Sequence, residues 1–475
     1  MANPLLNGLK QAVFFAYGLY TLLAYGFTAV VKGYFFKRPN EKEILELQLA
    51  RDRLWNLSKT VSGLHHQILT LRNGFKFHYV CNDLPETTAN NKPLVIFIHG
   101  FPDSWAIWRN LLSSPAIQQS ATVVAVDLPG YGGSDGLDEY TATDVLENLT
   151  GFILAVRSKY GVDGETEANK KRTIIVGHDW GCVLSMRLAS EAPELADRFI
   201  LSNGPLTRLV ASNIRRLLSS SLMMLKTSLR SPIQSRATIL KALKALRPVV
   251  RQVGLSGYIF AMKMPVSFVQ YLGTGGNHSF LKLTHRKSYG TDKYTPVDAA
   301  DCMASTMGPS IEELKTQTAG GQGYPSSISK ERTLSNFMHM ASYYRDNTAL
   351  ARWQKSAETI AELHNIQHGK HRRVSSGAGL FNEGPKGVLK ASSTFVWGKS
   401  DLALDPQLCL VGISDYLVPN SQVVELPRSG HFTPLEKESC AALEKAVEWA
   451  VQGEKEDLGA AIQRCYPGAA VTVRK

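Results

Sequence analysis

Asp179 stands in a segment whose residue types could carry chemistry. It lies between two glycines in GHDWG at residues 177–181, after the apolar run TIIV and before the helix-compatible run CVLSMRLAS. This order predicts a strand, a tight turn and a helix, and flanking glycines relieve a turn that lifts one side chain above a sheet. A carboxylate displaces a leaving group at a saturated carbon without a base to deprotonate it. The segment therefore indicates a carboxylate nucleophile.

An ester formed on Asp179 would have to be hydrolysed, and the attacking water requires a general base. His431 is the best-placed candidate because it lies in a loop after the predicted strand QVVELP. A carboxylate must in turn hold the tautomer of His431 and stabilise its imidazolium. The segment WGKSDLALDP offers Asp401 and Asp405, and Asp405 precedes a proline, as residues that cap helices often do.

Four motifs follow one another along the chain: HGFPDSW from His99, DLPGYGGSD from Asp127, GHDWG from Gly177 and SGHF from Ser429. Read together, they resemble the α/β-hydrolase-fold epoxide hydrolases, in the membrane-anchored, microsomal-like branch. The resemblance covers residues 65–205 and 390–455 and is thinner between them. It implies an enzyme that converts epoxides and water to vicinal diols without a cofactor. The membrane anchor expected at the N-terminus is what favours apolar or fatty epoxides.

The resemblance also implies roles for residues around the nucleophile. The triad acid falls four residues after the Trp-Gly of the preceding strand, which is Asp401, with Asp405 as the alternative. The backbone N–H groups of Phe101 and Trp180 are expected to form an oxyanion hole during ester hydrolysis. Trp105 is expected to line the substrate pocket.

An epoxide oxygen leaves as an alkoxide, a poor leaving group that must be hydrogen-bonded or protonated as it forms. In the family, two tyrosines of a cap domain meet this need. SGYIFAMKMP resembles the first tyrosine motif and gives Tyr258, and SYYRD resembles the second and gives Tyr344 rather than Tyr343. The expected catalytic residues are Asp179, His431, Asp401, Tyr258 and Tyr344.

Other functions fit parts of this pattern. A haloalkane-dehalogenase-like hydrolase also attacks with an aspartate followed by tryptophan, but it often carries Asn where Phe101 stands. A non-enzymatic α/β-hydrolase scaffold would need none of the expected catalytic residues. An esterase would carry serine in place of Asp179.

The order of apolar runs predicts the fold class. The central runs are continuously apolar, as in a parallel sheet covered by helices on both faces. The alternation of apolar strands with helices stops between Gly204 and Lys390, where helical segments alternate with loops instead. We therefore expect an α/β protein, with an α/β-hydrolase fold of mostly parallel twisted sheet flanked by helices. An inserted, mainly helical cap and an N-terminal membrane-anchor helix complete it.

The expected parts are an anchor at 1–36, a linker helix at 37–64, the first part of the core at 65–204, the helical cap at 205–390, and the second part of the core with the C-terminal tail at 391–475.

The N-terminal region predicts a membrane anchor. Residues 11–31 hold 21 positions without a charged side chain, which is long enough to span a bilayer. Bulky aromatic residues at 34–36 stand where a signal peptide would carry small residues for cleavage. More cations follow the segment than precede it, so the positive-inside rule places the catalytic part in the cytosol. We expect a single-pass anchor in the endoplasmic reticulum membrane.

The net charge of +12 is concentrated in residues 206–251, which contain no acidic side chain. No nucleic-acid-binding motif accompanies this charge, so nucleic acid is not an expected partner. Leucines and methionines between the cations fit an amphipathic surface lying on membrane lipid, or an ordinary solvated helix face.

The six cysteines are far apart and lack metal-ligand spacing, so no metal is expected. The sequence does not specify an oligomeric state.

Overall fold

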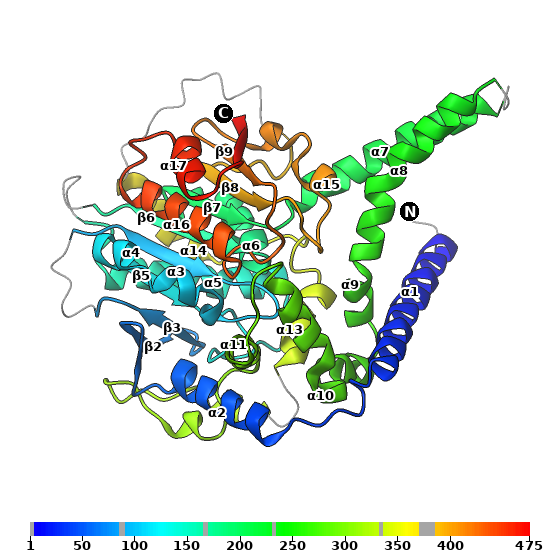
Figure 1. Cartoon of the computed structure of the whole chain (residues 1–475). Coiled ribbons are helices and arrows are strands. Elements are labelled where there is room, and N and C mark those ends of the chain that lie inside the picture. Colours follow the sequence, from blue (N-terminus) through cyan, green and yellow to red (C-terminus); the bar gives the residue numbers. More distant parts are fainter. Residues whose placement is uncertain (1–3, 85–90, 165–169, 230–233, 332–335, 370–384) are drawn as a thin grey trace.

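Ten strands of one sheet form the centre of the part of the chain that the structure describes (Figure 1). This computed structural model describes residues 4–84, 91–164, 170–229, 234–331, 336–369 and 385–475. The strands lie side by side in the order β1-β2-β3-β5-β4-β6-β7-β8-β9-β10. Their bounds are β1 Thr60–Val61, β2 Leu64–Thr70, β3 Lys76–Cys81, β4 Leu94–Ile98, β5 Thr122–Val126, β6 Thr173–His178, β7 Arg198–Ser202, β8 Ser393–Gly398, β9 Gln422–Leu426 and β10 Ala470–Arg474.

The central strands from β5 to β9 run parallel, whereas β1 to β3 and β10 pair antiparallel at the two ends of the sheet. The last residue of β4, Ile98, pairs with Val126 of β5 and with Gly177 of β6. The carboxyl ends of these strands therefore meet at one edge, where α/β sheets bind their ligands. The turns that follow these ends carry Phe101, Asp179, Asp401 and His431.

Two hydrophobic cores cover the two faces of the sheet. All of β4 is buried, and its residues alternate between the cores: Ile96 and Ile98 join one, Val95 and Phe97 the other. The first core contains α5 and α6, and the second contains α3, α4, α16 and α17. The expected α/β fold, with a mostly parallel sheet flanked by helices, is confirmed. These helices span α3 Arg109–Leu112, α4 Pro115–Ser120, α5 Ala142–Lys159, α6 Trp180–Glu191, α16 Lys437–Val451 and α17 Leu458–Cys465.

A mainly helical segment is inserted between β7 and β8, at the expected place. Its helices are α7 Thr207–Ser228, α8 Arg236–Leu255, α9 Gly257–Met262, α10 Val266–Ser288, α11 Pro296–Met307, α12 Ser326–Glu331, α13 Phe337–Arg345 and α14 Ala357–Gly369. Helix α14 falls within the expected cap but packs beside the core helix α5, where Thr359 donates a hydrogen bond of 2.8 Å to Glu147. Helix α15, Pro406–Leu410, follows β8.

The segment expected to be a linker helix packs against the rest of the protein through specific hydrogen bonds. Its helix, α2, spans Glu41–Trp55 and is followed by the short strand β1. The indole of Trp55 donates to the carbonyl of Ala304 in α11 at 2.8 Å, and Tyr324 donates to the carbonyl of Trp55 at 2.7 Å. The sequence analysis missed β1 and also β10, a strand at the sheet edge whose residues remain partly exposed.

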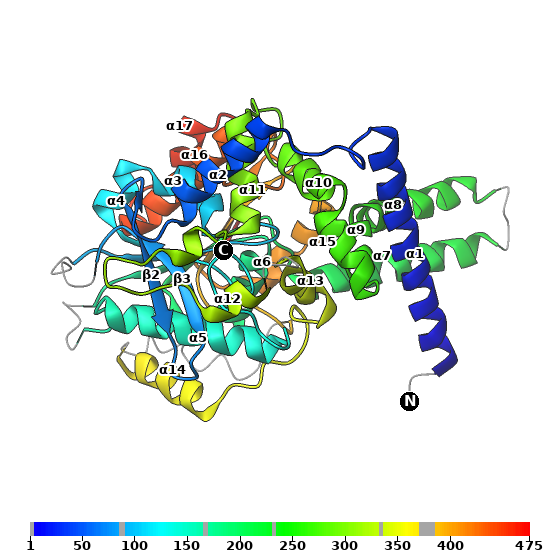
Figure 2. The same cartoon turned by 90° about the horizontal axis from the view of Figure 1, so that it is seen from below.

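Helix α1, Pro4–Val31, and the hairpin of α7 and α8 lie on the same side of the molecule (Figures 1 and 2). The hairpin projects from the body, and α1 runs beside α9 and α10. Residues 8–31 have a mean hydropathy of 1.5, and 11% of this apolar stretch is buried. Among the described residues, α1 is the one helix long and apolar enough to cross a membrane.

Candidate active site

Asp179 occupies the tight turn between β6 and α6, as its sequence context predicts. Its backbone is in an unusual region for a residue other than glycine, with φ 53° and ψ −115°. Such conformations cost about 1–3 kcal/mol and persist only where the surroundings enforce them. A Cβ on Gly181 would lie 2.0 Å from the carbonyl oxygen of Ile98, so only glycine allows α6 to approach β4 this closely. The turn thereby holds the Asp179 carboxylate at the carboxyl edge of the sheet.

The two oxygens of the Asp179 carboxylate have different partners. Oδ1 accepts a hydrogen bond of 2.7 Å from the backbone N–H of Phe101. Oδ2 lies 3.4 Å from Nε2 of His431. Trp180 is the first residue of α6, so its N–H has no acceptor within the helix. Of the two expected oxyanion donors, Phe101 therefore donates to the Asp179 carboxylate, and Trp180 directly follows Asp179 at the start of α6.

His431 is held by Asp401. Its Nδ1 donates to Oδ2 of Asp401 at 2.8 Å, which leaves Nε2 directed at Asp179. The fully buried Asp401 carboxylate accepts further hydrogen bonds from Asn203 Nδ2 at 2.7 Å and from two backbone N–H groups of its own loop. This arrangement fixes the tautomer and the orientation of the imidazole.

Asp405, the alternative acid, has other partners. It is the N-cap of α15, where its side chain accepts from the N–H of Gln407 at 2.9 Å. Its second oxygen accepts from Arg251 of α8 at 3.0 Å. Of the two carboxylates that the sequence left open, the structure therefore brings Asp401 to His431 and assigns Asp405 a capping position.

The contacts of Asp179 and His431 shift both pKa values. Burial raises the pKa of Asp179, but the hydrogen bond and charge of His431 and the N–H of Phe101 outweigh it, so that the pKa lies below its ordinary value. Burial lowers the pKa of His431, but the carboxylates of Asp401 and Asp179 outweigh it and raise the pKa to about 10. The two carboxylates therefore favour the protonated, imidazolium form of His431.

Tyr258 of α9 and Tyr344 of α13 line the same cavity as Asp179, and the centroids of the two tyrosine rings lie 5.7 Å apart. Burial, together with the Asp179 carboxylate, raises the pKa of each phenol above its ordinary value, so both remain proton donors. The neighbouring Tyr343 points elsewhere, because its hydroxyl donates to the carbonyl of Pro129 at 3.0 Å. The structure thus brings together the two tyrosines chosen from the sequence.

One cavity of about 1010 Å³ is lined by Asp179, Phe101, His431 and both candidate tyrosines. Trp105 does not line it, and the expectation for this residue is corrected. Its ring is fully buried, with ring centroids 6.2 Å from Trp55 and 5.9 Å from His66. Trp105 begins a short 3₁₀ helix, Trp105–Trp108, that turns the ring into the core below the sheet edge.

Several supporting residues were not assigned from the sequence. Asn203 follows β7 and also bridges to Gly398 at the end of β8, so it fixes the loop that carries Asp401. His178 donates from Nε2 to the carbonyl of His431 at 2.8 Å, and burial with the nearby His431 lowers its pKa to about 4. Asn203 could have been found from topology, because it directly follows β7, the strand next to β8.

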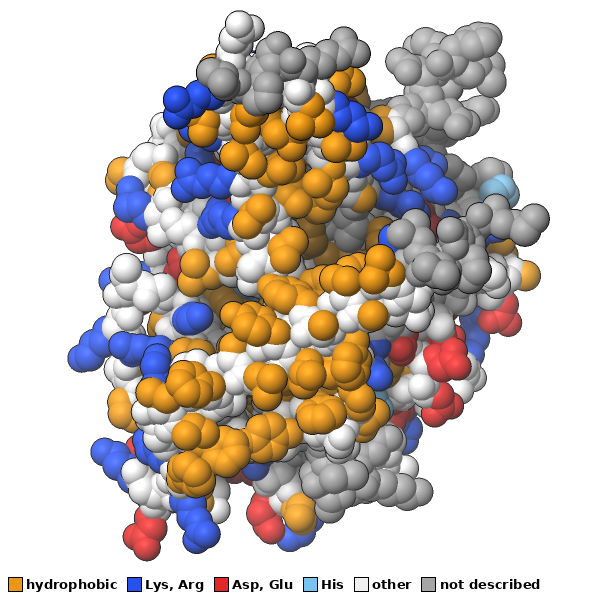
Figure 3. Space-filling view, turned by 90° about the vertical axis from the view of Figure 1, so that its right-hand side faces the viewer, with side chains coloured by type: hydrophobic (Ala, Val, Ile, Leu, Met, Phe, Trp, Pro, Cys, Tyr) orange, Lys and Arg blue, Asp and Glu red, His pale blue; other side chains and the backbone are white. Residues whose placement is uncertain are grey.

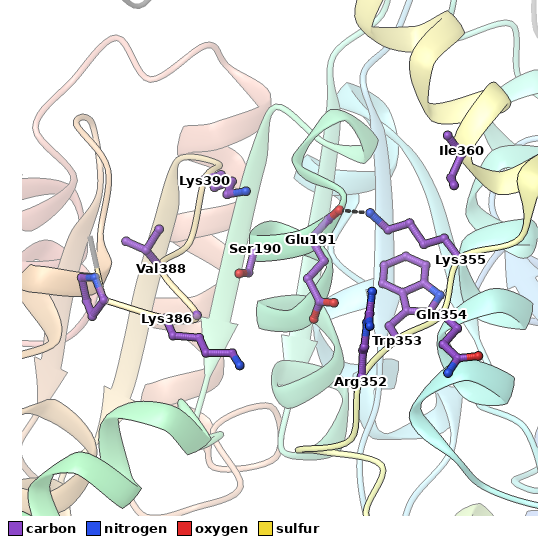
Figure 4. Close-up of a pocket in the computed structure, with 12 residues that line it drawn as sticks. Ser190, Glu191, Arg352, Trp353, Gln354, Lys355, Ile360, Lys386, Val388 and Lys390 are labelled. Atoms are coloured by element: carbon purple, nitrogen blue, oxygen red, sulfur yellow. Dashed lines mark hydrogen bonds between the residues drawn. The ribbon is translucent and has the colours of Figure 1, made fainter. Parts of the chain in front are cut away.

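A second hollow of about 1000 Å³ lies away from these residues (Figure 4). Lys355 there donates to the carbonyl of Glu191 and lies 4.8 Å from the ring centre of Trp353. Its described lining is basic and lacks a nucleophile paired with a base, so the candidate active site is the cavity around Asp179. Within the described ranges, the structure contains no group of three His, Cys, Asp or Glu side chains able to hold a metal ion.

Comparison with known proteins agrees with this architecture. The profile of the alpha/beta hydrolase family matches residues 95–445. Epoxide hydrolase 3 of Mus musculus is 33% identical over 151 residues, which are 30% of this chain and 36% of that protein. Epoxide hydrolase 1 of Caenorhabditis elegans is 35% identical over 133 residues, 27% of this chain and 28% of that protein. The aligned region thus spans about a third of the length of these relatives.

The structure of the Cif epoxide hydrolase from Acinetobacter nosocomialis aligns with 88% of this chain and 98% of its own, at 16% identity and a TM-score of 0.51. At this identity the likeness shows a shared fold.

Proposed function

Because the chain belongs to the alpha/beta hydrolase family, we propose that it hydrolyses epoxides to vicinal diols through a covalent ester on Asp179. The observation that carries this proposal is that one cavity is lined by the Asp179 carboxylate, by His431 and by two neighbouring phenols of the cap. A carboxylate can attack an epoxide carbon unaided, and the phenols supply what the leaving oxygen needs. The epoxide hydrolases among the relatives support the same reaction class.

In the first step, Oδ2 of Asp179 attacks an epoxide carbon. Oδ1 accepts a hydrogen bond from the N–H of Phe101, which leaves Oδ2, the oxygen that faces His431, to form the new bond. The carbon–oxygen bond of the epoxide breaks, and the resulting alkoxide takes a proton from Tyr258 or Tyr344. The product of this step is a hydroxyalkyl ester of Asp179.

Ester formation changes His431 from an acid into a base. The negative charge on Asp179 helps to raise the pKa of His431, and the ester removes that charge. The pKa of His431 then falls, the imidazolium loses its proton to the phenolate or solvent, and Nε2 accepts a proton from an attacking water. Water adds to the ester carbonyl carbon, and the negative charge on Oδ1 is stabilised by the N–H groups of Phe101 and Trp180. Collapse releases the diol and restores the Asp179 carboxylate.

The test follows the oxygen of the diol. With enzyme in excess over epoxide in heavy-oxygen water, a single turnover should give unlabelled diol and place the label in the Asp179 carboxylate. In the ester route, the bond between the substrate carbon and its new oxygen is never broken again. Direct attack by water would instead label the diol in the first turnover and leave the peptide containing Asp179 unchanged. That second outcome would overturn the covalent route.

The apolar or fatty class of the epoxide is part of the same proposal. It rests on the apolar lining near Tyr25, Leu255 and Phe280 and on the N-terminal helix. Comparing a panel of epoxides, haloalkanes and p-nitrophenyl esters tests the class of reaction at the same time. No contact in the described site favours a haloalkane or an ester over an epoxide, since the groups facing Asp179 from the cap are phenols.

We propose further that α1 spans the endoplasmic reticulum membrane once, with the cap helices α9 and α10 that pack against it at the membrane, the rest of the catalytic part in the cytosol, and the α7–α8 hairpin on the lipid surface. Figure 3 shows a broad area of hydrophobic side chains on this side of the molecule, with Lys and Arg near its border. Exposed apolar side chains of the hairpin include Leu222, Met223, Leu240 and Leu243. Basic amphipathic surfaces of this kind bind anionic lipid.

Extraction tests the membrane proposal. Full-length protein should remain with membranes in a high-salt wash and come into solution with detergent, because burial of α1 does not depend on ionic strength. Recovery in the salt wash would exclude the anchor. Protease added outside sealed microsomes should digest the catalytic part, and protection would reverse the orientation.

A further inference from the structure

Helix α1 forms part of the wall of the active-site cavity. Thr21 and Tyr25 line the same cavity as Asp179 and His431. Both side chains are half-buried, whereas Phe27, on another side of α1, is 71% exposed. A membrane anchor needs apolar surface toward lipid only. Because α1 also lines the cavity, we infer that this helix has a second role besides anchoring.

The contact between α1 and the cap is close and specific. A Cβ on Gly18 would lie 2.7 Å from the carbonyl oxygen of Phe260, so no other residue permits this approach of α1 to α9. Across the same crossing, a Cβ on Gly257 would lie 3.0 Å from the hydroxyl of Thr21. Tyr17 donates to the carbonyl of Val253 at 2.8 Å. Small residues that let helices approach closely are typical of specific helix association.

The helix that α1 contacts is also the one that carries a candidate acid. Gly257 directly precedes Tyr258 in α9, and Phe260 of the same helix lies against two aromatic rings of α1, Phe14 and Tyr17, at centroid distances of 5.2 and 5.1 Å. The ring of Tyr25 lies 5.1 Å from Phe280 of α10. The anchor helix thus supports the element that places a phenol opposite Asp179.

The lining of the cavity combines apolar and charged side chains. The rings of Tyr25 in α1 and Phe280 in α10 lie 5.1 Å apart, and both line the cavity together with Leu255. The charged side chains of the lining include Lys287, Asp292, Arg428 and Glu438. An apolar substrate would therefore be accommodated best against the apolar side chains beside the proposed membrane helix.

We propose that α1 forms the membrane-side wall of the substrate cavity, that apolar epoxides enter from the bilayer along this wall past Thr21 and Tyr25, and that these two residues limit the length of substrate accepted. The inference rests on the proposed function for the chemistry at Asp179. It goes beyond that function because it makes the N-terminal helix a determinant of specificity.

The first test fills the cavity from the side of α1. Thr21→Trp in full-length protein in phosphatidylcholine vesicles should lower kcat/KM for epoxyoctadecane about tenfold or more, because added volume displaces a long chain. Propylene oxide, which occupies only the space next to Asp179, should lose less of its kcat/KM than epoxyoctadecane, although Thr21 also lies against Gly257 of α9 and the added volume disturbs that contact. Ala24→Trp places the same indole on the exposed side of α1 and serves as the matched control. Equal values of kcat/KM for Thr21→Trp and Ala24→Trp would overturn the proposal.

The second test separates docking from anchoring. Gly18→Leu should force α1 away from α9 and lower the turnover of both epoxides, while the protein stays in the membrane fraction. Gly26→Leu is the control, because a Cβ there meets nothing within 4 Å. If Gly18→Leu and Gly26→Leu retain the same activity, docking of α1 does not support the site.

A third measurement needs no substrate. The double variant Thr21→Cys with Gly257→Cys should form a disulfide under mild oxidation in vesicles, detected by mass spectrometry of the linked peptides. Absence of this disulfide would overturn the wall assignment whatever the activity. A protein that forms the disulfide but hydrolyses no epoxide would overturn the proposed function and the substrate claim built on it, while retaining α1 as a wall of the cavity.

Discussion

The half of the active site built by the sheet and the half built by the cap are held in place by different forces. On the sheet side, directional hydrogen bonds fix each group: Asp401 bonds to His431 and Asn203, and Phe101 donates to Asp179. On the cap side, ring contacts hold Tyr344, whose ring centroid lies 5.6 Å from Phe101 and 5.0 Å from Trp180. In the proposed mechanism we therefore expect a division of labour, in which the sheet side hydrolyses the ester and the cap side is needed only to open the ring.

The largest expected effect comes from the base on the sheet side. His431→Gln should reduce multiple-turnover diol formation roughly 10,000-fold, because no group remains to activate water. Asp179 should still be alkylated, so the intact mass of the protein should rise by one substrate. If His431→Gln forms no ester with an epoxide that wild type hydrolyses, then the sheet side and the cap side do not act in separate steps.

Loss of the carboxylate behind His431 should be nearly as severe. Asp401→Asn should lower turnover about 1000-fold, because the amide cannot hold the same tautomer or stabilise the imidazolium. Asp405→Asn is the matched control and should change turnover by less than about threefold, since Asp405 caps α15 and pairs with Arg251. A larger loss in Asp405→Asn than in Asp401→Asn would reverse the assignment of the triad acid.

The phenols should give a smaller effect confined to the first step. Tyr258→Phe and Tyr344→Phe should each slow ring opening by about 10- to 1000-fold, and the double variant should be nearly inactive. Neither single variant should accumulate the ester, because the sheet side still hydrolyses it. Rapid-quench mass spectrometry measures the adduct directly. Accumulated ester in a tyrosine variant would show that the cap also takes part in hydrolysis.

The smallest expected effect is the response of ring opening to alkaline pH. Burial raises the pKa of Tyr258 and Tyr344, so both phenols keep their protons as the pH approaches the ordinary tyrosine value. The pKa of Asp179 is lowered, so its carboxylate is already ionised at the acidic end of this range. Single-turnover rates should therefore change by less than about twofold between about pH 7 and 9.5. A decline centred within that range would mean that an essential phenol ionises there.

The sheet side of the site could be predicted from the sequence because its residues lie in short turns directly after apolar strands. Asp179 comes directly after β6, and the carboxyl ends of parallel strands share one edge, so strand order alone brings Phe101, Asp179 and the loop of His431 together. The choice of Asp401 over Asp405 and the choice of the cap tyrosines came from family resemblance. The structure supplies their partners and distances.

Other features depend on side-chain packing that local sequence does not encode. Trp105 belongs to a motif next to the nucleophile, yet the direction of its ring is decided by a 3₁₀ helix that turns it toward Trp55 and His66. The apolar pattern of α1 predicts a membrane span but cannot say that Gly18 meets Phe260 in α9. Such contacts between distant segments become visible only when the fold is complete.

The position of the cap in the chain also bears on how the protein folds. Ser202 ends β7 and Ser393 begins the adjacent strand β8, so pairing of these two strands must close a loop that contains the whole cap. The entropy of closing a flexible loop rises with its length, by about 0.6 kcal/mol for each doubling. Helix hairpins such as α7–α8 are made of contacts close in sequence, which form quickly. We therefore expect the cap helices to form first and shorten the effective loop, with the triad assembled only in the final, slow pairing of β7 with β8.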